Sequence, residues 1–272
     1  MKELLELLKE GLSDGLVPWQ VEMQVAKATG AGFREIEATA LRGSLRLERY
    51  ARNYRTIGID EQLRLHEGCV AIIGCGGLGG YLIEGLARLG VGTLIAVDPD
   101  SFEASNLNRQ ILATITDLGR PKTQVAEERV RSINPATTVI QRQLRFEAAT
   151  ADLILAGVDV IADALDSIPS RLELAAAAAR LGLPLVHGAI AGWYVQATTA
   201  LPGSGAIEML FGSATTSRGI ETETGNPAFA PAVAASIQAA EITKLLLGKP
   251  AGLAGKLLHL DLERMTSLSL PL

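Results

Sequence analysis

The sequence is poor in cysteine and histidine, the side chains that most often hold structural metals. Its 272 residues include two cysteines, Cys69 and Cys75, and three histidines. The cysteines fall at the two ends of one predicted strand, too far apart to bond to each other. Because the chain also has no CxxC pair, we expect neither a disulfide framework nor a zinc site.

The sequence also lacks a long apolar run and an excess of basic residues. Polar or charged side chains interrupt every candidate membrane span, and residues 1–12 carry too many charges for a signal-peptide core. We therefore expect a cytoplasmic protein without a membrane partner. Its 25 basic and 30 acidic residues give a formal charge of −5, which argues against a general nucleic-acid or membrane-surface binder.

The sequence divides into a helical N-terminal appendage, residues 1–45, and a main domain, residues 46–272. Apolar residues at helical spacing predict helices over residues 1–12, 17–29 and 33–53. This spacing also suits a helix-turn-helix, but Glu35 and Glu37 outnumber Arg34 on the second helix. Acidic side chains there would face DNA phosphates unfavourably, so we expect a packing or dimer-forming appendage and not a DNA reader.

The main domain begins with a strand, a glycine-rich turn and a helix. The apolar run Val70–Ile73 leads into Gly74–Gly80, and an amphipathic stretch follows. The motif GxGxxG is formed by Gly74, Gly76 and Gly79. Asp98 ends the next apolar run, 19 residues after Gly79. Glycine lets the backbone approach a ligand closely, and the first helix amides attract phosphate. The pattern predicts a nucleotide-binding βαβ unit; a tight turn that binds nothing is the alternative.

Strands and helices alternate through the middle of the chain. The predicted strands are 69–73, 93–97, 137–143, 158–162 and 184–188, and the predicted helices are 77–89, 121–132, 146–156 and 167–182. This alternation predicts an α/β fold with a Rossmann-like, doubly wound, mostly parallel sheet.

The pattern changes after Gly192. Strands over 194–201, 256–262 and 266–270, with a helix over 230–247, predict an antiparallel C-terminal part. Residues 203–226, rich in Gly, Ser and Thr, predict a long mobile loop.

Charged residues gather near the predicted strand ends around the glycine turn. Arg109, Lys122 and Asp166 are the main ones. A triphosphate needs fixed cations and its magnesium needs carboxylate oxygens, whereas hydride transfer has no use for this set. Singly, each has a plainer interpretation. Arg109 suits a surface ion pair, Lys122 suits a solvated helix start, and Asp166 suits an N-cap.

An ordered series of motifs resembles the ThiF/MoeB/HesA family, the bacterial relatives of the ubiquitin-activating enzymes. The motifs are Arg49–Asn53, Gly74–Gly79, Ser105–Gln110, Gly119–Lys122, Asp166 and Gln238–Leu246, within residues from about 49 to 262. The resemblance implies that Arg52 reaches into the nucleotide site of a neighbouring subunit. We therefore expect a homodimer.

The resemblance also assigns a nucleotide site for ATP and Mg²⁺. The implied binding residues are Gly74, Gly76, Gly77, Gly79, Asp98, Ser105, Asn106, Asn108, Arg109, Lys122 and Asp166. Asp98 matches the ribose-binding acid, and Asp166 matches the magnesium-linked aspartate. Arg109 and Lys122 match the cations that hold the phosphates. The implied catalytic residues are Arg52, Arg109, Lys122 and Asp166.

The family's chemistry implies an adenylyltransferase. The C-terminal carboxylate of a small ubiquitin-like sulfur carrier, usually ending Gly-Gly, attacks the α-phosphorus of ATP and releases pyrophosphate. The product would serve sulfur transfer in thiamine, molybdopterin, tungstopterin or related biosynthesis.

The sequence departs from the family in its cysteines. Many members hold zinc with two CxxC pairs, and many carry a cysteine in the loop that corresponds to residues 203–226. This chain has neither feature. The resemblance therefore implies adenylation here and a separate sulfur donor.

Other functions stay open at this point. An NAD-dependent oxidoreductase would rest on the glycine turn and Asp98 alone. A non-catalytic nucleotide-binding partner subunit and an enzyme that adenylates a non-protein carboxylate are further alternatives.

Overall fold

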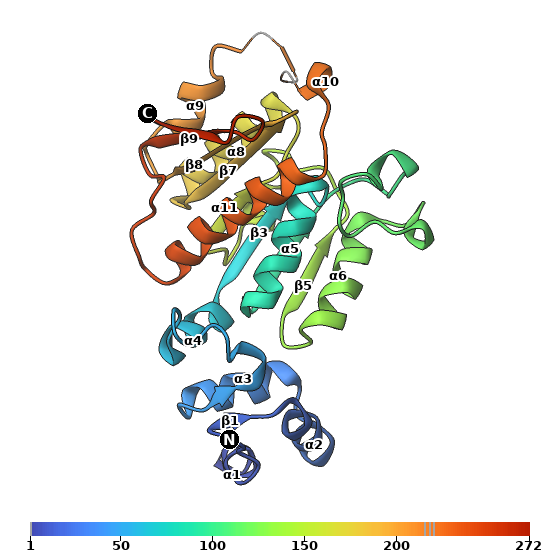
Figure 1. Ribbon diagram of the computed structural model, residues 1–272, viewed down its shortest axis with the longest axis vertical. Helices are drawn as coiled ribbons and strands as arrows, with labels where there is room; N and C mark the ends of the chain where they lie inside the picture. The colour runs from blue at the N-terminus through green and yellow to red at the C-terminus, as the bar shows by residue number, and fades with distance from the viewer. Residues whose placement is uncertain (1, 215, 218, 220) are drawn as a thin grey trace.

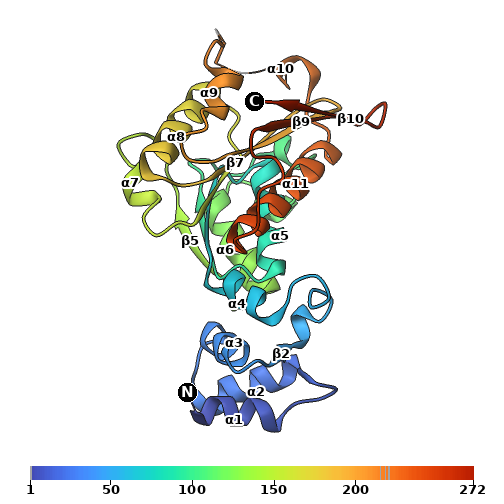
Figure 2. The same cartoon turned by 90° about the vertical axis from the view of Figure 1, so that its left-hand side faces the viewer.

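A central sheet with helices on both faces forms most of the molecule, and a small helical module lies beyond one end (Figure 1; Figure 2). This computed structural model describes residues 2–214, 216, 217, 219 and 221–272. The sheet has eight strands in the order β10-β9-β8-β7-β6-β3-β4-β5.

The first five strands of the sheet in chain order are parallel. They are β3 (Cys69–Ile73), β4 (Thr93–Val97), β5 (Thr138–Arg142), β6 (Val160–Asp163) and β7 (Leu185–Ala191). The helices between them are α5 (Gly77–Leu89), α6 (Lys122–Ile133), α7 (Ala151–Ile154) and α8 (Ile168–Leu181). The predicted mostly parallel, Rossmann-like sheet is confirmed. The predicted helix over 146–156 is wrong in length, because the Thr150 hydroxyl donates to the Glu147 carbonyl and closes a turn before α7.

The rest of the sheet is antiparallel, as predicted. It contains β7, β8 (Tyr194–Ala200), β9 (Lys256–Asp261) and β10 (Thr266–Pro271), and α11 (Phe229–Leu246) lies against α5 and β7. The long loop predicted over 203–226 is wrong in part, because α9 (Ala206–Phe211) and α10 (Glu221–Thr224) form within it. The buried side chain of Ile207 fixes α9 to the core. Residues 215, 218 and 220 of this predicted loop lie outside the described residues.

Both faces of the parallel sheet are buried. Val70 and Ile72 of β3 pack with α5, α6 and α11 on one face. Ala71 and Ile73 pack with α7, α8 and α9 on the other face. Figure 2 shows these two helical layers on opposite sides of the sheet. Burial of both faces explains why the strand sequence is continuously apolar.

The N-terminal module lies beyond the amino end of β3 (Figure 1). Its elements are α1 (Lys2–Glu10), β1 (Leu16–Val17), α2 (Trp19–Thr29), α3 (Phe33–Arg42) and β2 (Arg46–Leu47), followed by η1 (Glu48–Tyr50) and α4 (Ile59–Glu67). The helix predicted over 33–53 is wrong beyond Arg42, because Gly43 caps it and Ser44 takes a φ of 57°. The module's apolar core extends as far as Leu63, and the division at residue 45 stays a prediction.

Glu22 of α2 is a buried carboxylate whose two oxygens have no hydrogen-bond partner among the described residues. Burial raises the pKa of Glu22 to about 8; the charges of Glu37 and Glu48 add to the shift and Arg49 opposes it. An unfolded glutamate has a pKa of about 4.3, so between these values only the folded state keeps the proton. The free energy of unfolding therefore falls as pH rises through this window.

We expect Glu22→Gln to remove this contribution to the pH dependence. The stability difference between variant and wild type should change in the variant's favour by about 1 kcal/mol per pH unit between pH 5 and pH 8. Urea denaturation at several pH values measures it. Parallel stability curves for the two proteins would contradict the buried titration.

Candidate functional site

A cavity of about 530 Å³ lies at the carboxyl ends of β3, β4 and β6. In an open α/β sheet this edge is where ligands bind, next to the point where the strand order reverses. The cavity brings together the predicted residues Gly74, Gly76, Gly77, Asp98, Arg109, Lys122 and Asp166. The predicted residues Arg52, Gly79, Ser105, Asn106 and Asn108 do not line it.

The glycine turn between β3 and α5 is packed too closely for larger residues. Gly74 has a φ of 101°, and a Cβ there would lie 2.5 Å from the Ala164 carbonyl oxygen. A Cβ at Gly79 would lie 1.8 Å from the Gly74 carbonyl oxygen. Gly79 therefore keeps the helix close to the turn without reaching the cavity. Gly77 starts α5, whose first N–H groups lack helical partners and favour an anion.

Asp98 ties the end of β4 to the glycine turn. Its Oδ2 accepts the N–H of Cys75 at 2.7 Å, and its Oδ1 accepts the N–H of Asp100 at 2.8 Å. Burial raises the pKa of Asp98, and the charge of Lys122 and these two N–H groups oppose the increase. Cys75 itself is fully buried, and burial raises the pKa of its thiol well above the ordinary value, which suits packing and not nucleophilic attack.

Lys122 is the first residue of α6 and is buried, with 6% of its surface exposed. Its Nζ lies 3.2 Å from Asp100 Oδ2 and 3.7 Å from Asp98 Oδ1. The alternative of a solvated lysine is therefore wrong. A buried lysine needs acidic partners, and these carboxylates hold its ammonium at the wall of the cavity.

The segment 105–110 forms one side of the cavity through Arg109. Its guanidinium donates from Nη1 to the Ser105 carbonyl at 3.0 Å and to Asn108 Oδ1 at 2.9 Å. Asn106 Oδ1 accepts the N–H of Glu103, and Asn108 Nδ2 donates to the Asn226 carbonyl. Ser105, Asn106 and Asn108 thus shape the loop that presents Arg109.

Asp166 is exposed and lines the cavity after β6. The N-cap of α8 is Ser167, whose Oγ accepts the N–H of Ser170, so the alternative of Asp166 as N-cap is wrong by one residue. The carboxylate of Asp163 supports the loop, because its Oδ1 accepts the N–H of Leu165 at 3.0 Å.

Behind this loop, Asp163 Oδ2 lies 2.6 Å from His187 Nδ1. Burial alone would raise the pKa of Asp163, but the hydrogen bond and charge of His187 hold it below its ordinary value. Arg171 Nε lies 3.6 Å from Asp163 Oδ2, and Arg171 Nη2 donates to the Leu165 carbonyl. The Asp166 loop therefore rests on a buried polar cluster.

Sequence reasoning missed seven polar residues of the cavity wall, three of which are Ser167, Ser170 and Asn226. The other four are Asp100, Gln110, Arg145 and Arg171. Gln110 is buried beside Gly76, and its Oε1 has no hydrogen-bond partner among the described residues. Its position next to Arg109 was the signal that could have identified it. Arg145 and Arg171 carry no such signal, because only the folded chain brings them to the cavity.

Arg52 is exposed in the segment between η1 and α4. This segment lies near the amino end of β3, whereas the cavity lies at the carboxyl end (Figure 1). Arg52 therefore does not join the cavity of its own chain.

Known proteins resemble this chain in sequence and in fold. Residues 50–272 match the model for the ThiF family. The SAMP-activating enzyme E1 of Haloferax volcanii is 38% identical over 229 residues, covering 83% of this chain and 85% of that protein. A sulfur carrier protein adenylyltransferase of Thermus thermophilus is 36% identical over 225 residues, covering 79% and 83%. Escherichia coli MccB, solved with ATP, shares the fold at a TM-score of 0.68 and 20% identity, over 99% of this chain and 86% of MccB.

Proposed function

Because the chain belongs to the ThiF family, we propose that it is an adenylyltransferase that activates the C-terminal carboxylate of a small ubiquitin-like sulfur carrier with ATP. The observation that carries the proposal is the cavity, which joins the glycine turn to Arg109, Lys122 and Asp166. Two relatives named for carrier activation and adenylation support it. The nicotinamide alternative rested on the turn and Asp98 alone, and we do not retain it.

The reaction joins two anions, so the chain must supply positive charge. A carboxylate oxygen of the carrier attacks the α-phosphorus, the bond to the β-phosphate oxygen breaks, and pyrophosphate leaves with its electrons. Arg109 and Lys122 neutralise the phosphates as charge develops on the leaving group, and the first amides of α5 face the phosphate chain. Asp98, already fixed by two N–H groups, would bind the ribose hydroxyls.

Asp166 fits a role in holding Mg²⁺. It is an exposed carboxylate on the cavity wall, and Mg²⁺ binds through one or two carboxylates together with substrate phosphates. When bound, the ion would neutralise phosphate charge. Within the described ranges no cluster of three or more His, Cys, Asp or Glu side chains forms a ready-made metal site. A site completed by phosphate oxygens agrees with this composition; the expected lack of zinc stays a prediction.

Arg52 is the residue that leads us to propose a second subunit. Its exposed side chain and its place at the other end of the sheet from its own cavity support action on a second copy of the chain. A homodimer would supply that copy. We also propose that a separate protein donates the sulfur and that the enzyme is cytoplasmic. No helix in the described part of the chain is both long and apolar enough to cross a bilayer.

Mass spectrometry of the carrier tests the proposed reaction. Enzyme, ATP, Mg²⁺ and a carrier ending in Gly-Gly should give a carrier that has gained one adenylyl group, and added pyrophosphate should remove it. The matched control is the same carrier without its last glycine, which should stay unmodified. Unmodified carriers throughout, with ATP bound, would contradict the proposal and favour a non-protein carboxylate.

A further inference from the structure

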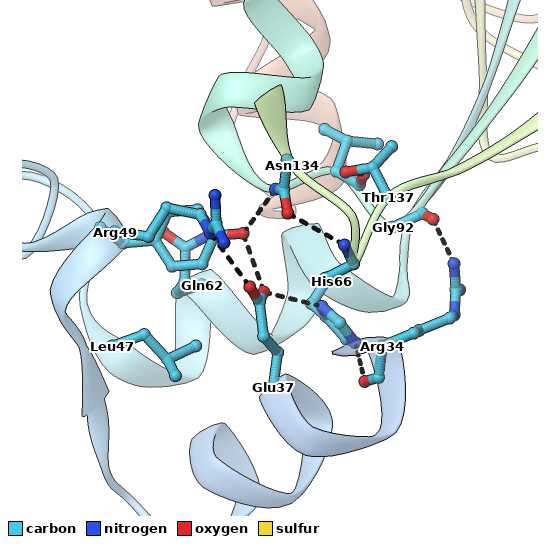
Figure 3. Close-up of polar contacts among 12 residues, drawn as sticks. Arg34, Glu37, Leu47, Arg49, Gln62, His66, Gly92, Asn134 and Thr137 are labelled. Atoms are coloured by element: carbon cyan, nitrogen blue, oxygen red, sulfur yellow. Dashed lines mark hydrogen bonds and ion pairs between the residues drawn. The ribbon is translucent and has the colours of Figure 1, made fainter. Parts of the chain in front are cut away.

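A buried carboxylate joins the N-terminal module to the nucleotide-binding domain. Glu37 of α3 is fully buried. Its Oε1 accepts from Arg49 Nε at 3.2 Å, and its Oε2 accepts from the Tyr50 hydroxyl at 2.9 Å. Figure 3 shows Glu37 at the centre of these contacts, with Arg49, His66 and Asn134 around it.

The contacts of Glu37 continue to the two helices that begin at the cavity. Asn134, which follows α6, donates from Nδ2 to the Tyr50 hydroxyl at 2.8 Å and to the Ala87 carbonyl of α5 at 2.9 Å. Arg49 Nη1 donates to the Ile133 carbonyl at the end of α6 at 2.8 Å. The cluster therefore holds the C-terminal ends of α5 and α6, whose N-terminal ends carry Gly77 and Lys122.

The segment that carries Arg52 is anchored on both sides by these contacts. Arg49 and Tyr50 precede it and bind Glu37. Asn53 follows it and donates to Gln62 Oε1 at 3.4 Å, while Gln62 Nε2 donates to the Leu89 carbonyl at 2.7 Å. Arg52 itself is left exposed between the two anchors.

We propose that Glu37 is a positioning residue for Arg52. It fixes the turn after η1 so that the arginine is presented in one orientation to the nucleotide site of a second copy of the chain. The inference rests on the proposed function, in which Arg52 contacts the phosphates of the partner's ATP. A displacement of about 1 Å in such a group can cost about 100-fold in rate, so a buried anchor would matter to the reaction.

Glu37 offers two acceptor oxygens to the cluster, and one of them lies beside the guanidinium of Arg49. Burial raises the pKa of Glu37, and the charge of Arg49 and the hydrogen bonds from Tyr50 and Arg49 oppose the increase. His66 Nδ1 lies 3.8 Å from Oε2, but burial lowers the pKa of His66 to about 4, so its ring is neutral at pH 7. Arg49 is therefore the cation that stabilises the carboxylate. A glutamine would offer one acceptor for two donors and no charge.

A double-mutant cycle tests the proposal in carrier-dependent ATP–pyrophosphate exchange at saturating ATP and carrier. Arg52→Ala alone should lower kcat by about 10²-fold or more. Glu37→Gln alone should lower kcat by about tenfold with the KM for ATP unchanged. In the Arg52→Ala background, Glu37→Gln should change kcat by less than about twofold, because the group that it positions is gone. Tyr50→Phe, which removes a single hydroxyl, should behave like Glu37→Gln and serves where that variant folds poorly.

Glu22→Gln is the matched control, because Glu22 is a buried carboxylate of the same module without hydrogen-bond partners in the described residues. It should leave kcat unchanged. An equal loss from Glu37→Gln in both backgrounds, or no loss in either, would overturn the inference. Full activity of Arg52→Ala would overturn it too, together with the proposed role of Arg52 in a second subunit, and would leave the proposed adenylation reaction standing. A wild-type protein without carrier-dependent exchange would instead mean that the proposed function fails.

Discussion

Lys122→Ala is expected to lower the kcat of carrier-dependent ATP–pyrophosphate exchange by about 10²–10³-fold. The buried ammonium, 3.2 Å from Asp100 Oδ2 and 3.7 Å from Asp98 Oδ1, is fixed at the cavity before ATP arrives. The ammonium therefore needs little reorganisation when charge develops on the leaving pyrophosphate. The alanine substitution removes this preorganised positive charge. The exchange rate should be measured well below the Tm of both proteins, because the substitution also removes a buried ion pair.

Arg120→Ala is the matched control for Lys122. Arg120 lies two positions before Lys122 and does not line the cavity. Its Nη1 lies 2.8 Å from Asp117 Oδ1, and its Nη2 lies 2.6 Å from Glu128 Oε1. Because Arg120 lies outside the cavity, its removal takes no positive charge away from the bound phosphates, so exchange should stay within about twofold of wild type. Equal exchange by the two variants would show that Lys122 only holds Asp98 and Asp100 in place.

Gly79→Ala is expected to destabilise the protein by about 3 kcal/mol and to abolish ATP binding. The added Cβ would lie 1.8 Å from the Gly74 carbonyl oxygen and 2.8 Å from its carbonyl carbon. Both atoms belong to the backbone, so the glycine turn itself would have to move. Urea denaturation measures the loss of stability, and an ATP titration measures the loss of binding.

Gly85→Ala, in the same helix, is the matched control and is expected to stabilise the protein. A Cβ at Gly85 would meet no heavy atom within 4 Å, so alanine should stabilise α5 by about 0.5–1 kcal/mol and leave ATP binding unchanged. Similar stability of the two variants would contradict the close packing between Gly79 and the turn.

The sequence predicted the parallel sheet because its strands are buried on both faces. A continuous apolar run such as Val70–Ile73, followed by a glycine turn and an amphipathic helix, has few other structural solutions. The charged cavity residues Arg109, Lys122 and Asp166 were predicted because they stand in motifs that resemble those of the family.

Some of the errors come from contacts between distant parts of the chain, and others come from local backbone geometry. The buried state of Glu37 could not be predicted from an amphipathic helix, because its partners lie on η1 and α4, and one of them, Tyr50, is in turn held by Asn134. Arg145 and Arg171 reach the cavity wall only through the packing of the sheet. The early end of α3 depended on the left-handed backbone of Ser44, a conformation that serine seldom takes.

The most direct test of the proposed function is ATP–pyrophosphate exchange by the wild-type protein with candidate carriers that end in Gly-Gly. The proposal predicts exchange that requires one such carrier and disappears when its last glycine is deleted. Exchange without any carrier, or none with every carrier tested despite measurable ATP binding, would contradict it.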